Sequence, residues 1–354
     1  MSSLLHLAAA VDQPGTPDAG TFAELALLAE SGGLDFVTLD DPSARPGPDA
    51  LAVLSRLAPA TRRIGLVPAV TTTRTELCRV RAAVAALDRV SSGRAGLRID
   101  VSDAEGEARL SGRGHAAPPE ALWREAVEVA DAAAGLWDGG EDGAGIRDAA
   151  TGRPLDRDRP HRADFTGTAF SGRGPSTVPR PPRGHPVRVV DATGDHALTV
   201  AARYADVALV RATAPAQAAG VRDLLRERAR VSGRNPDTLR VLVSLLVDLG
   251  DGERAAEPGH GGGGPRPTAR GPLYRGGPVD LAELMTAWHA DGVTEGFHLI
   301  PVEPRRDLER LVNGTVALLQ HRGLFRTFYP GSTLREHLGL GRPANRYAVT
   351  GGTS

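Results

Sequence analysis

The sequence predicts an α/β protein folded as a (β/α)8 TIM barrel with loop insertions. Short apolar runs alternate with longer amphipathic stretches about eight times along the 354 residues. The short runs are almost entirely apolar, as expected of parallel strands that helices cover. The rival fold, an open doubly wound sheet, would carry a glycine fingerprint after its first strand, but VDQPG stands there instead, at residues 11–15.

The first half of the chain contains four predicted strand–helix pairs. The strands are expected at Leu4–Val11, Asp35–Leu39, Ile64–Val70 and Ala95–Val101. Each is short and apolar, and each is followed by a stretch with apolar residues at helical spacing. These helices are expected at Thr21–Ser31, Asp49–Leu57, Glu76–Val90 and Leu122–Trp137.

The second half repeats the pattern four more times. Strands are expected at Pro186–Asp191, Asp206–Val210, Leu239–Leu249 and Gly296–Pro301. The helices are expected at Ala197–Tyr204, Ala216–Ser232, Val279–Ala290 and Asp307–His321. The chain after Leu324 shows no such periodicity and is predicted to be irregular.

We expect residues 1–340 to form one domain with two interruptions. Residues 138–184 are rich in Gly, Pro, Arg and Asp and too long for an ordinary connection, so they are predicted to be an insertion. Residues 250–277 include GHGGGGPRP and are predicted to be a mobile Gly/Pro-rich loop. Residues 341–354 are expected to be an irregular tail.

Composition excludes several classes of function. The net charge is −1 and aromatic residues make up 4%, which argues against a nucleic-acid binder. All 42 basic residues are arginine, so lysine-based phosphate loops and Schiff bases are excluded. Cys78 is the only cysteine, and no HExxH-like spacing occurs, so we expect neither a disulfide nor a metal site. The absence of a signal-like start and of a long apolar run predicts a cytoplasmic protein that does not enter membranes.

Five segments of the chain have a characteristic sequence and order. They are Arg63–Glu76, Leu87–Ser102, Phe170–Ala192, Ala201–Val207 and Leu318–Leu340. Taken together, they resemble the bacterial luciferase-like flavin monooxygenases, and the nearest branch contains the nitrilotriacetate and dibenzothiophene-sulfone monooxygenases. The resemblance implies a TIM barrel that takes reduced FMN from a separate flavin reductase, uses O2 to oxygenate a small organic substrate, and often forms homo-oligomers.

The resemblance also implies a flavin site at the strand ends. It places Asp41 and Thr72 near the flavin ring, after the second and third strands, and the FMN phosphate at Thr193 and Gly194, where a helix begins. The residues also allow plainer interpretations. Asp41 can cap the turn before Pro42, and the threonines can cap helices.

Three residues are candidates for catalysis. Arg98 stands where relatives commonly carry Asn, and it could hold an anionic flavin or a substrate carboxylate, block the pocket, or pair with Asp100. His298 in the last strand could point into the barrel mouth or be a satisfied strand histidine. His115 lies one residue away from the family's histidine position, and the accompanying tyrosine is missing. His6 on the first strand is a weaker candidate for the pocket.

Three functions stay open at this point. The first is a monooxygenase that uses reduced FMN. The second is a deazaflavin-dependent oxidoreductase with the same barrel. The third is a flavin-binding or flavin-free scaffold without catalysis, which Arg98, Gly194 and the missing tyrosine motivate.

Overall fold

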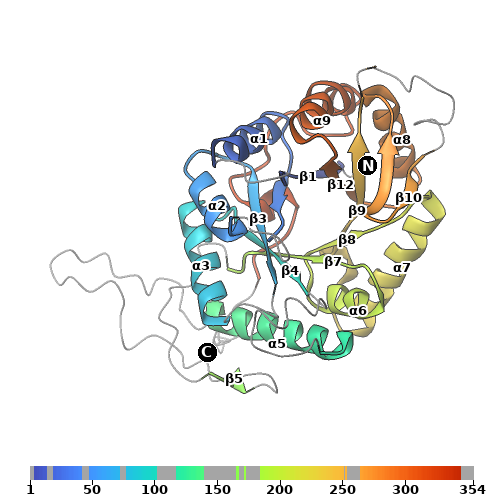
Figure 1. Cartoon of the computed structure of the whole chain (residues 1–354). Coiled ribbons are helices and arrows are strands. Elements are labelled where there is room, and N and C mark those ends of the chain that lie inside the picture. Colours follow the sequence, from blue (N-terminus) through green and yellow to red (C-terminus); the bar gives the residue numbers. More distant parts are fainter. Residues whose placement is uncertain are drawn as a thin grey trace, which may run out of the picture.

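The computed structural model is a closed barrel of eight parallel strands, which confirms the predicted TIM barrel (Figure 1). It describes residues 4–13, 19–41, 48–71, 77–101, 117–138, 165–166, 171–172, 184–250, 252 and 264–343. Each strand pairs with the next in the order of the chain, and the last pairs with the first. The barrel strands are β1 (His6–Ala10), β2 (Phe36–Leu39), β3 (Gly65–Thr71), β4 (Gly96–Asp100), β7 (Val187–Asp191), β8 (Val207–Val210), β9 (Arg240–Asp248) and β12 (Gly296–Pro301).

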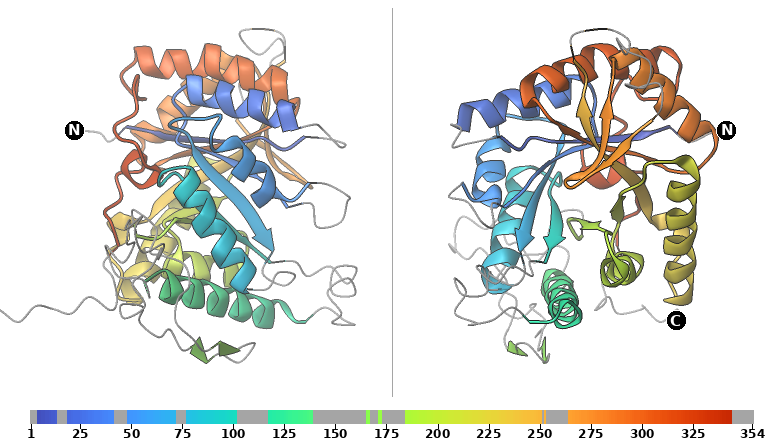
Figure 2. Two further views of the ribbon diagram at one scale, coloured as in Figure 1. Left: turned by 90° about the vertical axis from the view of Figure 1, so that its left-hand side faces the viewer. Right: turned by 45° about the vertical axis from the view of Figure 1, so that its right-hand side comes forward.

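The helices run along the outside of the barrel (Figure 2). Within the described residues, no helix is long and apolar enough to cross a membrane. The helix predicted at 307–321 is interrupted by a π-helical turn at Leu311–Val316, where Thr315 donates a 2.9 Å hydrogen bond to the carbonyl of Pro278. The helices are α1 (Ala19–Ser31), α2 (Ala50–Leu57), α3 (Leu77–Val90), α5 (Pro119–Asp138), α6 (Asp195–Tyr204), α7 (Pro215–Val231), α8 (Pro278–Ala290), α9 (Pro304–Arg310) and α10 (Ala317–His321).

Successive side chains of each strand point alternately out of and into the barrel, and this divides the core into an outer and an inner part. Side chains such as Leu7 and Val37 belong to the large cluster beneath the helices. Their neighbours, including Ala8 and Phe36, belong to a separate cluster that fills the barrel. The barrel is therefore a packed core, and its chemistry is confined to the ends of the strands.

A short helix closes the N-terminal end of the barrel, where an irregular tail was predicted. Helix α11 (Leu334–His337) begins with a capping box between Thr333 and Glu336. Leu334 packs inside the barrel, and a Cβ on Gly65 would come within 2.6 Å of it, so only glycine leaves it room. Figure 2 shows this red segment at the same end of the barrel as the N-terminus. The prediction was wrong because four residues are too few to show a period.

Part of the predicted loop at 250–277 is a β-hairpin. Strands β10 (Arg266–Thr268) and β11 (Gly271–Arg275) pair with each other, and β11 also pairs in parallel with the C-terminal half of β9. Tyr274 is fully buried, which anchors the hairpin to the barrel rim. Of the predicted insertion at 138–184, the structure describes both ends and the short pair β5 (Phe165–Thr166) and β6 (Ser171–Gly172). Residues 344–354 of the tail lie outside the described residues.

Candidate active site at the C-terminal ends of the strands

Charged side chains gather at the C-terminal ends of five strands. Every second residue of a strand points into the barrel, and this alternation brings one or two charged residues per strand to the rim. Because parallel strands end at a common edge, these residues surround one opening, which we call the mouth. They are Asp12 after β1, Asp40 after β2, Arg98 and Asp100 on β4, Asp191 on β7 and Arg211 after β8.

Arg98 is held between two carboxylates. Its Nε and Nη2 donate to the two oxygens of Asp100 at 2.9 and 2.6 Å, and Nη2 also lies 2.6 Å from Oδ1 of Asp40. Burial would lower the pKa of Arg98, but Asp100 and Asp40 raise it well above its ordinary value. Of the roles left open by the sequence, pairing with Asp100 is the one this geometry shows directly.

Asp40 carries a negative charge at the rim. The surrounding protein would raise the pKa of this carboxyl, but the Arg98 guanidinium outweighs that effect and holds the pKa below its ordinary value. More than half of the Asp40 side chain is exposed, so a bound molecule could reach it. Asp41, the residue predicted to lie near the flavin, follows it and is half-buried.

Asp12 is a functional candidate that the sequence reasoning missed. Its Oδ1 accepts a 2.8 Å hydrogen bond from the backbone N–H of Asp40. Burial, followed by the negative charge of Asp40, raises the pKa of Asp12 to about 7. The signal was present, because Asp12 follows the first predicted strand as Asp40 follows the second.

His298 lies in the barrel interior, beneath the mouth. It is 2% exposed, and its Nε2 and Nδ1 lie 2.9 Å from the Thr38 hydroxyl and 2.8 Å from the Ser244 hydroxyl. Burial, assisted by Arg98, lowers the pKa of His298 to about 4, so the ring is neutral at pH 7. Since both ring nitrogens have hydroxyl partners, the structure favours a positioning role over direct catalysis for this predicted residue.

His6 lies at the opposite end of the barrel from the mouth. It begins β1, and its Nδ1 is 3.2 Å from Oδ1 of Asp35, which precedes β2. The suggestion that it lines the pocket is therefore wrong. A strand histidine reaches the catalytic end only when it stands late in its strand.

The N-terminus of α6 is open to the mouth. Gly194 is its N-cap with φ +91°, no side chain caps the helix, and a Cβ at this position would meet nothing within 4 Å. Thr193, predicted to bind phosphate, donates its hydroxyl to Asp191 instead. Asp191 also pairs with Arg211 at 3.0 Å, and Asp195 pairs with Arg228 at 2.7 Å. With both carboxylates neutralised, the backbone N–H groups of α6 fit an anion such as a phosphate.

Two predicted site residues cannot be placed. Thr72 and His115 lie outside the described residues. Thr71, the last residue of β3, is buried. Across the described ranges, no group of three or more His, Cys, Asp or Glu side chains is arranged to hold a metal ion.

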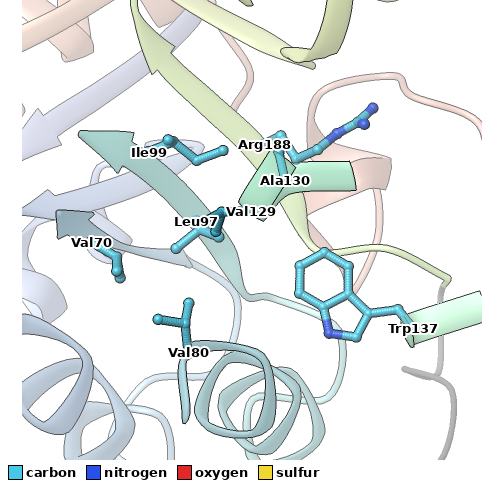
Figure 3. Close-up of a pocket in the computed structure, with 8 residues that line it drawn as sticks. All are labelled: Val70, Val80, Leu97, Ile99, Val129, Ala130, Trp137 and Arg188. Atoms are coloured by element: carbon cyan, nitrogen blue, oxygen red, sulfur yellow. The ribbon is translucent and has the colours of Figure 1, made fainter. Parts of the chain in front are cut away.

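An apolar cavity lies behind the strands and not in the mouth (Figure 3). Leu97 and Ile99 flank Arg98 in sequence and therefore point to the other side of the sheet, toward α3 and α5. Arg188 borders the cavity, but its guanidinium pairs with Asp206. The lining is thus part of the packing between barrel and helices. It consists of Val70, Val80, Leu97, Ile99, Val129, Ala130, Trp137 and Arg188.

Comparisons with known proteins agree with this architecture. A family model described as luciferase-like monooxygenase matches residues 1–297. The chain is 30% identical to the N-acetyl-S-(2-succino)cysteine monooxygenase of Bacillus subtilis (strain 168), over 92% of this chain and 91% of that relative. It is 30% identical to component A of the nitrilotriacetate monooxygenase of Aminobacter aminovorans, with the same coverage. The crystal structure of a long-chain alkane monooxygenase superposes with a TM-score of 0.84 at 19% identity, covering 96% of each chain.

These relatives decide between the functions that the sequence left open. The two similar sequences are both monooxygenases, and each is matched over nearly its whole length. They favour oxygenation over deazaflavin hydride transfer and over a scaffold without catalysis. The chain belongs to the luciferase-like monooxygenase family and is a flavin-dependent monooxygenase.

Proposed function

We propose that this chain is the oxygenating component of a two-component system in the cytoplasm. It takes reduced FMN from a separate flavin reductase and uses O2 to insert one oxygen atom into a small organic substrate. The observation that supports this is the mouth itself, where an open helix N-terminus and a hydrogen-bonding charge cluster share one rim. An anionic phosphate and a polar ring are the two recognition elements of FMN.

The phosphate would be held at the start of α6. The helix dipole and the first backbone N–H groups, which the N-cap residue Gly194 does not cap, favour an anion there. Gly194 leaves the approach open, because it carries no side chain. Arg211 stands beside this position through its pair with Asp191, which it neutralises, and its guanidinium has further N–H donors for a phosphate. It is a cofactor-binding candidate that the sequence reasoning did not name.

The ring would be held by the cluster around Arg98. When bound, reduced FMN supplies the electrons that activate O2. Arg98 donates hydrogen bonds from a guanidinium fixed by Asp40 and Asp100, so it is oriented before the cofactor arrives. His298 lies beneath the mouth as a neutral ring whose two nitrogens hydrogen-bond the Thr38 and Ser244 hydroxyls.

Oxygen incorporation tests the proposed function directly. The protein is supplied with NADH, a flavin reductase, FMN and 18O2, together with a panel of small organic compounds that includes N-acetyl-S-(2-succino)cysteine and nitrilotriacetate. We expect mass spectrometry to find one 18O atom in at least one product. Absence of labelled product across the panel, together with no binding of reduced FMN, would contradict the proposal.

A pair of glycine variants tests the phosphate seat. Gly194→Ala places a side chain at φ +91°, which costs about 1 kcal/mol and shifts the N–H groups of α6, so we expect FMN to bind about five- to tenfold more weakly. Gly233→Ala is the matched control. It has φ +76° and equally open surroundings, but it follows the C-terminus of α7. Fluorescence titration with FMN should separate the two variants. Equal affinities of the two variants for FMN would argue against phosphate binding at the N-terminus of α6.

A further inference from the structure

Counted over the described residues, the cluster at the mouth has more carboxylates than cations. Asp12, Asp40 and Asp100 surround a single guanidinium, that of Arg98. The hydrogen bonds from Arg98 go to Asp40 and Asp100. Asp12 accepts a hydrogen bond from the backbone N–H of Asp40, and Arg98 acts on it through its charge without a hydrogen bond. If all three carboxylates were ionised, the cluster would carry an excess negative charge in a partly buried site.

Within the part of the chain that the structure describes, the other charged and titratable groups around the mouth offset that excess only in part. Arg211 after β8 lowers the pKa of Asp40 through its charge, but its guanidinium pairs with Asp191 on β7. His298 on β12, the strand beside β1, is held neutral between two hydroxyls. Two neighbouring carboxylates that lack a second cation share a proton rather than both ionising. Of the three, Asp12 is the one to which no described arginine donates a hydrogen bond, so the proton resides there.

We propose that Asp12 holds a proton at Oδ2 in the resting enzyme and is the acid that delivers it to the reacting oxygen. This inference rests on the proposed function. Overall, O2, the substrate and the two hydrogens of reduced flavin give oxygenated substrate, water and oxidised flavin. Asp12 gives one proton to the oxygen atom that leaves as water. It recovers a proton from the two hydrogens that the flavin releases, so the residue is unchanged after each turnover.

The acidity of Asp12 suits this task. Its pKa of about 7 leaves it partly protonated at neutral pH, because burial and the charge of Asp40 oppose ionisation. An acid is most effective when its pKa lies near the working pH. Asp40 cannot serve in the same way, because the Arg98 guanidinium holds its pKa below the ordinary value.

Infrared spectroscopy of the flavin-free protein tests whether the proton is there. Asp88 is the matched control, because its burial also raises its pKa to about 7 but it lies on α3, away from the cluster. We expect the carboxylic-acid carbonyl band to titrate near pH 7, with Asp12→Asn removing one component and Asp88→Asn removing another. An Asp12→Asn spectrum identical to that of the wild type from pH 5 to 9 would overturn the proposal, whatever the activity.

The pH profile of oxygenation tests whether that proton is used. With the panel compound that the wild type oxygenates fastest, we expect kcat to fall on the basic side of about pH 7. Asp12→Asn should lower kcat about 100-fold and abolish this basic limb. Asp12→Glu should keep the limb, and the exposed Asp223→Asn should match the wild type. A basic limb that survives in Asp12→Asn would overturn the catalytic role.

The two experiments also separate this inference from the proposed function. If no panel compound is oxygenated but the infrared component is lost in Asp12→Asn, the proposed function fails and the location of the proton is supported. If oxygenation occurs and the infrared component is absent, the proposed function stands and the inference fails.

Discussion

Both ends of the barrel carry aspartates close to arginines, but the pKa values of these aspartates differ between the two ends. At the N-terminal end, Asp35 and Asp206 each precede a strand, are almost fully buried, and pair with Arg326 and Arg188 respectively. Although burial opposes ionisation, these arginines (with His6 acting first on Asp35) hold both pKa values below the ordinary range. At the mouth, the pKa of Asp12 is raised to about 7. The number of cations within reach therefore decides whether an aspartate keeps or releases its proton.

The cations at the N-terminal end come partly from the C-terminal segment. Arg326 reaches Asp35, and Arg335 lies 3.4 Å from Asp206 as a second partner beside Arg188. The segment that plugs the barrel thus also neutralises its buried carboxylates. This division agrees with the general behaviour of TIM barrels, in which one end supplies stability and the other supplies chemistry.

The largest effect is expected from breaking a pair at the N-terminal end. Asp206→Ala leaves Arg188 and Arg335 buried without their carboxylate, so the free energy of unfolding should fall by about 3–5 kcal/mol. Urea denaturation measures this change, with the exposed Asp223→Ala as control. Since the folded pKa of Asp206 is depressed, its stabilisation is present above about pH 4 and is lost as the pH falls below that value. If Asp206→Ala lost no more unfolding free energy than Asp223→Ala, the stabilising role assigned to the N-terminal ion pairs would be contradicted.

An intermediate effect is expected from removing the cation at the mouth. Arg98→Met removes the cation that lowers the pKa of Asp40, and the loss should be about 2 kcal/mol at pH 8, because this carboxylate is partly exposed. At pH 5 most of this loss should disappear, since a carboxylate that has lost its cation can take up a proton. Urea denaturation at both pH values measures this recovery. Asp206→Ala should show no such recovery, because an arginine cannot release its proton in this range. Equal losses of Arg98→Met at pH 5 and 8 would refute the distinction between the ends.

The smallest effect is expected from a substitution that stabilises the fold. The raised folded pKa of Asp12 means that it takes up a proton on folding between about pH 4 and 7, so its contribution to stability falls as the pH rises through that window. Asp12→Asn keeps the acceptor for the Asp40 N–H without the charge. Urea denaturation should show a gain of about 1 kcal/mol at pH 8 and no change at pH 4. A variant that is less stable than the wild type at pH 8 would contradict the assigned proton.

Most of the fold was predictable because it follows from patterns within short windows. Eight apolar runs and their amphipathic partners identified the barrel strands and most of the helices around them. Helix α11 and the β10–β11 hairpin were missed, since each is too short to show a period and is held by contacts with distant residues such as Gly65 and the C-terminal half of β9. The rule that chemistry lies at strand ends also pointed to Asp12, although it was applied only to the second and later strands.

The order of residues along this chain was sufficient to establish the barrel and the rim on which its polar groups stand. It could not establish which of those polar groups form hydrogen bonds or ion pairs with one another. Asp12 and Asp40 are 28 residues apart, and Thr38 and His298 are 260 apart. Proton affinity depends on the charges and the solvent within a few ångströms of a group, and these neighbours become adjacent only when the strands close into a ring.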